Sequence, residues 1–242
     1  MGKTMLTMDL AARVTTGAAW PDGADGCLGS VLLATAEDGL ADTLRPRLDA
    51  AGADVRRVSA LEAVTRVSGD DPDAFTCADA DLVERAIRGL GGCRLVVIDP
   101  VSAFYPPRTD TNSQSEIRGV LRPIASLAER TGCCVLLVSH LNKSQGGKSL
   151  YRVSGSLALI AAARCGWLVE FDKDDRARRL FLPSKNNLSP DRGGLAYGVE
   201  GDPPRVVWED GAVMVTADEA LNSGSKQNSL AGRGGHRRSA PL

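Results

Sequence analysis

The distribution of apolar and polar residues predicts alternating strands and helices over the first 140 residues. Thr4 to Thr16 carries apolar side chains at helical spacing and is followed by Gly17, a typical helix stop. Short apolar runs then alternate with segments of helical periodicity. We expect strands over 30–36, 54–58, 95–98 and 133–138, and helices over 40–51, 81–90 and 116–131. Such alternation predicts an α/β fold with a mostly parallel sheet flanked by helices.

The pattern changes after residue 150, where strands follow one another without long helices between them. A small-residue helix over 154–163 precedes this region. Strands are expected over 167–171, 179–182, 195–199 and 206–208, separated by turn residues. These strands predict C-terminal antiparallel hairpins that extend the sheet.

The last twenty residues, 223–242, differ in composition from the rest of the chain. They contain Lys226, Arg233, Arg237 and Arg238, no acidic residue, and many Ser and Gly. This composition is typical of a disordered basic tail. We therefore expect one folded domain over 1–217 and a tail over 218–242.

Three of the predicted strands run directly into polar residues. Glu37 follows the first strand, Asp99 ends the 95–98 run, and Ser139-His140 follows the 133–138 run. In open α/β sheets ligands bind at the carboxyl ends of the strands, so these side chains are expected to converge on one crevice. Taken singly, Glu37 could be a helix N-terminal acid, Asp99-Pro100 a turn, and His140 an ordinary loop histidine.

Gly2-Lys3-Thr4, directly before an apolar helix, matches the end of the phosphate-binding motif G-x-x-x-x-G-K-[ST]. In that motif backbone N–H groups hold phosphates, the Lys contacts the β and γ oxygens, and the hydroxyl ligates Mg²⁺. Gly2, Lys3 and Thr4 would then bind the nucleotide. Thr4 and Asp99 would hold the metal. Three residues alone would more often mark only the start of a helix.

Composition is compatible with a soluble α/β enzyme and excludes a membrane-spanning chain. Of the 242 residues, 43% are apolar and 24% charged, which is ordinary globular usage, and no run reaches the length of a membrane span. The six cysteines show no zinc-ligand spacing, which favours a reduced cytoplasmic protein. A net charge of −1 means that any DNA contact must come from local patches such as 143–152, which could also be a solvated loop.

Together, these residues resemble the RecA-like AAA family ATPases of the RepA-type hexameric helicase group. The similarity covers roughly residues 1–217. The matching segments are Gly2-Lys3-Thr4, Thr35-Ala36-Glu37-Asp38-Gly39, Val97-Ile98-Asp99-Pro100, Ser139-His140-Leu141-Asn142-Lys143-Ser144 and Arg152-Val153-Ser154-Gly155-Ser156. The resemblance implies a RecA-like P-loop core that uses ATP and Mg²⁺, with Glu37 as catalytic carboxylate and His140 as γ-phosphate sensor. It also implies a homo-oligomer, a hexameric ring, that acts on single-stranded DNA.

The chain departs from the family pattern at its start and near the family's arginine finger. The family has a strand and further loop glycines before the position of Gly2, so we expect an N-terminal truncation within the Walker A motif and a missing first core strand. Arg152 is offset from the expected finger position. Lys185 resembles a basic residue that related helicases insert across a subunit boundary. Both are kept as candidates.

The sequence thus favours a motor ATPase, a DNA helicase or a helicase-like replication or mobile-element protein. Two alternatives stay open. The incomplete loop is compatible with a non-catalytic or degenerate P-loop assembly subunit. A P-loop kinase would need an Arg-rich lid and an acceptor pocket, and the strand end at His140 with terminal hairpins argues against it.

Overall fold

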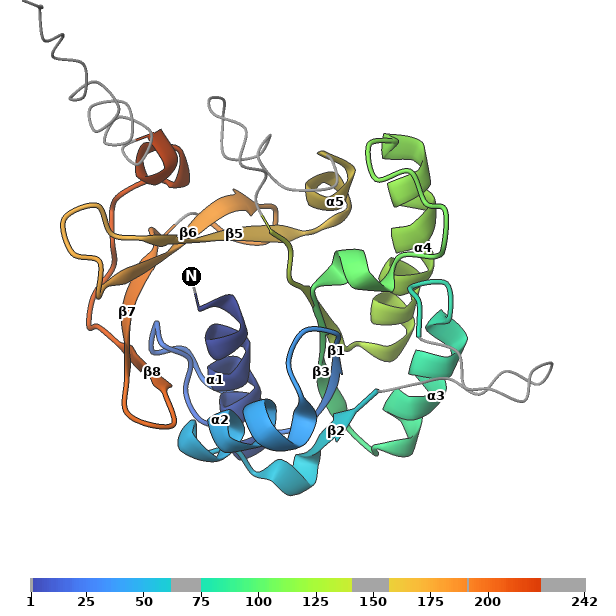
Figure 1. The fold of residues 1–242 in the computed structure, drawn as a ribbon, viewed down its shortest axis with the longest axis horizontal. Helices are drawn as coiled ribbons and strands as arrows, with labels where there is room; N and C mark the ends of the chain where they lie inside the picture. The colour runs from blue at the N-terminus through green and yellow to red at the C-terminus, as the bar shows by residue number, and fades with distance from the viewer. Residues whose placement is uncertain (1, 62–74, 141–156, 191, 223–242) are drawn as a thin grey trace, which may run out of the picture.

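The computed structural model describes residues 2–61, 75–140, 157–190 and 192–222, which contain two four-stranded sheets (Figure 1). The first sheet is parallel, with strand order β2-β1-β3-β4. Its strands are β1 (Ser30–Thr35), β2 (Val58–Ala60), β3 (Cys93–Asp99) and β4 (Cys134–Leu137). The central strands β1 and β3 are almost wholly buried, as their continuous apolar sequences require. The α/β fold with a parallel sheet is therefore confirmed.

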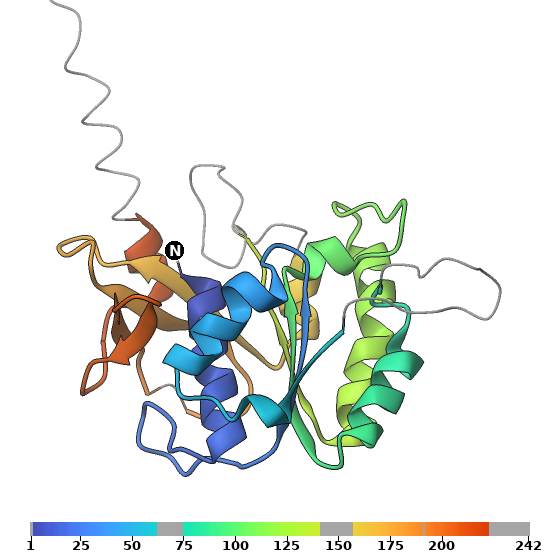
Figure 2. The ribbon, with the colours of Figure 1, turned by 60° about the horizontal axis from the view of Figure 1, so that its bottom comes forward.

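Helices cover both faces of the parallel sheet. One face packs against α3 (Ala80–Gly89), α4 (Gln114–Thr131) and the short α5 (Leu157–Ala162). The other face packs against α1 (Lys3–Thr16) and α2 (Arg45–Ala50). Figure 2 shows these two layers on opposite sides of the sheet.

The second sheet is antiparallel, with strand order β5-β6-β7-β8. Its strands are β5 (Cys165–Phe171), β6 (Arg179–Asn186), β7 (Leu195–Glu200) and β8 (Arg205–Trp208). The predicted C-terminal hairpins are confirmed. On the outer face, Leu168, Leu180 and Leu182 pack against Ala220 and Leu221 of a helical turn at 217–222. The described packing thus continues past residue 217, the expected domain boundary, and the tail at 223–242 lies outside the described residues.

Helix α1 lies between the two sheets (Figures 1 and 2). Met8, Ala11 and Val14 pack on the parallel sheet, whereas Met5 and Leu6 pack on the antiparallel sheet. Asp9 on the same helix also accepts a hydrogen bond from Trp208 Nε1 at 2.8 Å. A helix with apolar residues on two faces holds two sheets together, and this fixes where its N-terminus points.

Two local predictions differ from the structure. The strand expected over 54–58 is a 3₁₀ turn, η2 (Val55–Arg57), followed by β2, because the Asp54 carboxylate accepts the Arg56 N–H and bends the chain. The helix expected over 40–51 consists of a π-helical turn, η1 (Leu40–Leu44), and α2. Pro46 at the start of α2 lacks an N–H, so the two pieces have different hydrogen-bond patterns.

β4 and β5 are edge strands of their sheets. Among the described residues, β4 pairs only with β3, and β5 only with β6. Cys134 in β4 and Trp167 in β5 are exposed, the latter by 44%. Within the same described part of the chain, no helix is both long and apolar enough to cross a bilayer.

Candidate nucleotide site

The N-terminus of α1 points toward the carboxyl ends of β1 and β3. Gly2 caps the helix in the left-handed conformation, with φ of 85°, which glycine adopts without a steric penalty. Lys3 and Thr4 are the first two helical residues. The N-terminus of a 14-residue helix presents free N–H groups and partial positive charge, so it favours an anion at this place.

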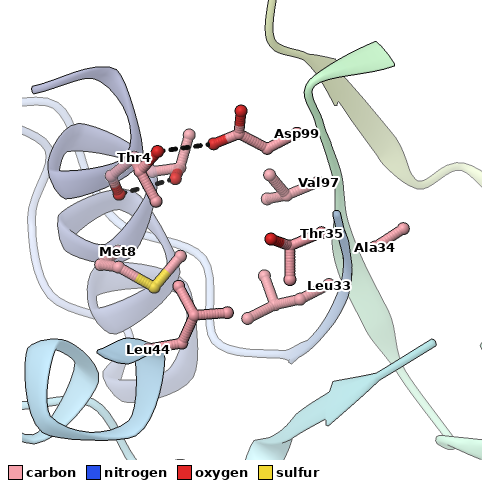
Figure 3. Close-up of a pocket in the computed structure, with 9 residues that line it drawn as sticks. Thr4, Met8, Leu33, Ala34, Thr35, Leu44, Val97 and Asp99 are labelled. Carbon is pink, nitrogen blue, oxygen red and sulfur yellow. Dashed lines mark hydrogen bonds between the residues drawn. The ribbon is translucent and has the colours of Figure 1, made fainter. Parts of the chain in front are cut away.

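Thr4 is joined to Asp99, the last residue of β3. The Thr4 hydroxyl donates to Asp99 Oδ2 at 3.0 Å, as the dashed line in Figure 3 shows. Asp99 is only 7% exposed, and this burial raises the pKa of its carboxyl. The hydrogen bond from Thr4 lowers the pKa but does not offset the burial. A carboxylate in this position is poised to gain from a nearby cation.

Lys3 lies over the same strand ends. Its Nζ is 3.2 Å from His140 Nδ1. Burial lowers the pKa of the Lys3 ammonium, although the charges of Asp99, Glu37 and Glu170 raise it in part. The net shift means that the ammonium is incompletely compensated by the protein, so an anionic ligand would stabilise it.

Glu37 and His140 form the more exposed side of the group. His140 Nε2 is 3.5 Å from Glu37 Oε1, and both side chains are more than half exposed. Contacts therefore run from Glu37 through His140 to Lys3. The structure brings together the five residues that the sequence proposed, because β1, β3 and β4 end, and α1 begins, at this side of the parallel sheet. They are Lys3, Thr4, Glu37, Asp99 and His140. The roles of these residues remain predictions.

The space beneath this group is too small for a nucleotide. A cavity of about 10 Å³ lies under Thr4 and Asp99, and Met8, Leu33 and Val97 form part of its apolar wall (Figure 3). A ligand must therefore lie on the outer side of Thr4 and Asp99, where Glu37 and His140 are exposed.

A hydroxyl and a carboxylate are the donors that Mg²⁺ accepts. Thr4 Oγ1 and Asp99 Oδ2 lie within 3.0 Å of each other. Mg²⁺ prefers oxygen ligands, keeps several waters, and is commonly held by one or two protein groups plus phosphate. In the described residues no cluster of three His, Cys, Asp or Glu side chains forms an all-protein metal site. The pair therefore suits Mg²⁺ bound together with a phosphate.

The antiparallel sheet contributes two residues that the sequence did not single out. Arg179 of β6 lies so close to Gly2 that a Cβ on the glycine would be 3.3 Å from Arg179 Nε. This Nε is buried and has no hydrogen-bond partner in the described structure. Glu170 of β5 is near enough to raise the pKa of Lys3. Both residues belong to ordinary strand patterns, so only the packing of α1 against this sheet reveals them.

Arg152 and Lys185 are the two basic residues that could act in a neighbouring subunit's site. Arg152 lies outside the described residues. The Lys185 ammonium donates to the backbone oxygens of Ile160, Ala161 and Ala163 at 2.9, 3.2 and 2.7 Å. It thereby satisfies carbonyls at the C-terminal end of α5, where a cation is favourable.

Solved structures with the same arrangement are RecA-like. One of them, described as an ATPase domain, aligns over 81% of this chain and 77% of its own, with a TM-score of 0.57 and 14% identity. A DnaB-like replicative helicase, described with its interactions with primase, aligns over 82% of this chain with a TM-score of 0.58 and 13% identity. The chain spans about half of that helicase, 54% of its length.

The RadB recombinase aligns over 85% of this chain and 86% of its own, with a TM-score of 0.51 and 15% identity. At these identities the likenesses show the RecA-like fold. No curated protein sequence matches the chain.

A family match covers the part of the chain that carries the site. Residues 1–146, more than half of the chain, match AAA_25, a family described as an AAA domain. These residues include all five side chains gathered at the strand ends. The chain therefore belongs to the AAA_25 family of AAA domains.

Proposed function

We propose that this protein is a RecA-like motor ATPase that binds and hydrolyses ATP and acts as a helicase or helicase-like protein on DNA. The observation that carries the proposal is the group at the strand ends. At the N-terminus of α1, Lys3 contacts His140, and Thr4 contacts the buried Asp99. Glu37 lies beside His140. This combination of residues supports phosphoryl transfer from a nucleoside triphosphate.

Each side chain then has a part in hydrolysis. Lys3 and the α1 N-terminus would bind the phosphate oxygens, because both are electropositive and Lys3 is incompletely compensated. Glu37 would orient and deprotonate the attacking water. His140, which touches Glu37 and Lys3, would report the state of the γ-phosphate. Thr4 and Asp99 would hold Mg²⁺, which neutralises developing charge on the phosphate when it is bound.

We propose that an additional strand between β4 and β5 would complete the site. Both strands have free edges among the described residues, and both lie beside α1 through Leu136 and Val169. β4 is an edge strand with apolar side chains on both faces, since Val135 and Leu137 pack on the core beside α4 and Leu136 packs on the core beside α1. A strand ending in a glycine-rich turn there would place more N–H groups near Lys3.

Titration of Mg·ATP tests the nucleotide site and the added strand separately. We expect a chain extended before Met1 by an engineered strand and glycine-rich loop to bind tightly, and the 242-residue chain to bind more weakly. Lys3→Ala in the extended chain should abolish binding, with Lys173→Ala, an exposed turn residue, as the matched control. Equal Mg·ATP affinities of the two chains would contradict the added strand. Mg·ATP binding by Lys3→Ala equal to that of the unsubstituted chain would contradict the nucleotide site.

The oligomeric and DNA-dependent parts of the proposal are supported by the fold shared with a replicative helicase and a recombinase. We propose the RepA-type group, a hexameric ring, single-stranded DNA as partner, and a cytoplasmic location. A ring places a basic group from one subunit in the next subunit's site. The candidates are Arg152 and, if it leaves its α5 carbonyls, Lys185.

Subunit mixing tests this arrangement. An Arg152→Ala or Lys185→Ala subunit, each mixed with a Lys3→Ala subunit, should regain hydrolysis that neither has alone, since some interfaces then contain an intact site. Single-stranded DNA should stimulate wild-type hydrolysis. Mixtures no more active than their components would exclude a finger acting in trans. Hydrolysis unchanged by DNA would exclude the motor function while leaving ATP binding intact.

A further inference from the structure

Two buried thiols meet at the amino end of the parallel sheet, opposite the nucleotide site. Cys93 is the first residue of β3 and is 6% exposed, and Cys133 directly precedes β4 and is 3% exposed. The Cys133 thiol donates to Cys93 Sγ at an S–S separation of 3.7 Å. All six cysteines of the chain are free thiols in this structure.

An irregularity in β3 places both thiols on the same face of the sheet. With strict alternation, Cys93 would point the same way as Leu95 and Val97, which belong to the core beside α1. The register shifts at Arg94, which has no partner in β1, and Cys93 instead joins Cys133 in the core beside α4.

The backbone separation suits a covalent bond. β3 and β4 are adjacent parallel strands with Leu95 opposite Cys134, so Cys133 lies one residue and Cys93 two residues before this pair. A lateral spacing of about 4.8 Å and an offset of one residue, about 3.3 Å along the strand, give a Cα separation of roughly 6 Å, within the range of about 4.4–6.8 Å that disulfides span. The sulfur atoms need to approach each other by less than about 2 Å to reach bonding distance.

Cys93 is also reachable from outside. A hollow of about 220 Å³ beside it is lined by Ile87, Arg88, Gly92, Cys93, Arg130 and Thr131. A molecule of peroxide is small enough to enter this space. The hydrogen bond from Cys133 lowers the pKa of the Cys93 thiol, which burial opposes, and raises the pKa of Cys133. Cys93 is therefore the more readily ionised thiol of the pair.

We propose that Cys93 and Cys133 are a peroxide-reactive dithiol that closes to a disulfide between β3 and β4. The Cys93 thiolate attacks one oxygen of hydrogen peroxide, the O–O bond breaks, and Cys93 becomes a sulfenic acid as the departing hydroxide takes up a proton to form water. Cys133 sulfur then attacks the Cys93 sulfur, the S–O bond breaks, and the second water leaves with the Cys133 proton. Two thiols are oxidised and one peroxide is reduced to two waters.

The other cysteines provide an internal comparison. Cys27 and Cys134 are exposed. The charges of Cys27 and Cys165 add to burial in raising the pKa of Cys134, but among the described residues the thiol–thiol hydrogen bond joins Cys133 and Cys93. Cys77 is buried, and this burial raises its pKa to about 12. Exposure alone would therefore direct peroxide to Cys27 and Cys134, whereas proximity directs disulfide formation to Cys93 and Cys133.

Mass spectrometry of the reduced 242-residue chain tests the proposal. After treatment with hydrogen peroxide, the remaining thiols are alkylated in denaturant and the protein is digested. We expect a loss of two alkylatable thiols and a cross-linked peptide pair that contains Cys93 and Cys133. Cys93→Ser and Cys133→Ser should each abolish the cross-link, and Cys134→Ser should retain it.

The wild-type digest decides the question even if a variant fails to fold. The proposal would be overturned if all six thiols remained alkylatable or if only exposed cysteines were oxidised. A dominant cross-link through Cys134 would also overturn it. Thermal unfolding supplies a second measurement. The bond closes a loop of about 40 residues, so the oxidised chain should melt roughly 5–10 °C higher than the reduced one. A lower melting temperature would argue against a bond that fits the native strands.

Discussion

Charged side chains at the two ends of the parallel sheet have opposite pKa shifts: the protein disfavours their charged forms at the carboxyl end and favours them at the amino end. At the carboxyl end, burial raises the pKa of Asp99 and lowers the pKa of Lys3, so the protein disfavours the charged form of both. At the amino end, Glu84 is bound by Arg130 and Arg88, each at 2.6 Å, and these partners lower its pKa. Charges that the fold leaves uncompensated indicate ligand binding, whereas charges that the fold compensates indicate a structural role.

Apolar side chains near the amino end are buried. Leu127, in the C-terminal part of α4, is fully buried and shares one core with Cys93 and Cys133. At the carboxyl end, by contrast, the side chains of Glu37 and His140 are exposed. Substitutions should therefore affect activity at one end and stability at the other.

The largest effect is expected for Glu37→Gln, in the form of the protein that binds Mg·ATP. The amide fills the same space but cannot accept the water proton, so hydrolysis should fall roughly 10²–10⁴-fold while ATP affinity is retained. Asp38→Asn is the matched control, since Asp38 is adjacent but pairs with Arg47 at 2.9 Å. Single-turnover hydrolysis and calorimetric titration measure the two quantities. Unchanged turnover in Glu37→Gln would remove Glu37 from the mechanism.

Next comes Leu127→Ala, at the packed end. Leu127 is fully buried in the core beside α4, so truncation removes apolar contacts and leaves a cavity. The free energy of unfolding should fall by about 2–5 kcal/mol. Urea denaturation measures it, with Glu129→Ala on the exposed side of α4 as control. A loss no larger than that of the control would mean that this core is not tightly packed.

Asp99→Asn should have a smaller effect of the opposite sign on stability. Because the pKa of Asp99 is raised in the folded protein, ionisation of its carboxyl disfavours folding. This cost is fully present above the folded pKa and disappears as pH falls toward the unfolded value. We expect the variant to melt a few degrees higher than wild type at pH 8, with the difference vanishing in acid, and to bind Mg·ATP less well. A lower melting temperature at pH 8 would contradict this.

The smallest effect is expected for Glu84→Gln. The partners Arg130 and Arg88 lower the pKa of Glu84, so its contribution to stability is present above the unfolded pKa and is lost as pH falls through the folded pKa. The variant should melt slightly lower than wild type at pH 7, and the gap should narrow in 1 M salt or at acid pH. Glu129→Gln serves as the control. A gap that persists in acid would have to come from packing.

Much of the fold could be predicted from the sequence because its signals are local. Apolar runs such as the one ending at Asp99 indicate buried strands, and the helical spacing of 4–16 indicates α1. The error at 54–58 has a local cause too, since the Asp54 side chain competes for a backbone N–H and turns the chain before β2. Polar residues at parallel strand ends meet by topology, so the group around Asp99 could be predicted without coordinates.

What the sequence determined by itself is therefore the order of the elements and the chemistry at their ends: Lys3 and Thr4 at a helix start, and Glu37, Asp99 and His140 after strands. Only the tertiary structure brought Arg179 beside Gly2, because that contact depends on α1 packing against a sheet formed about 180 residues later. Likewise, only the register shift at Arg94 turned Cys93 toward Cys133. Periodicity along a chain specifies which face is apolar, whereas contacts between distant segments depend on how those faces pack.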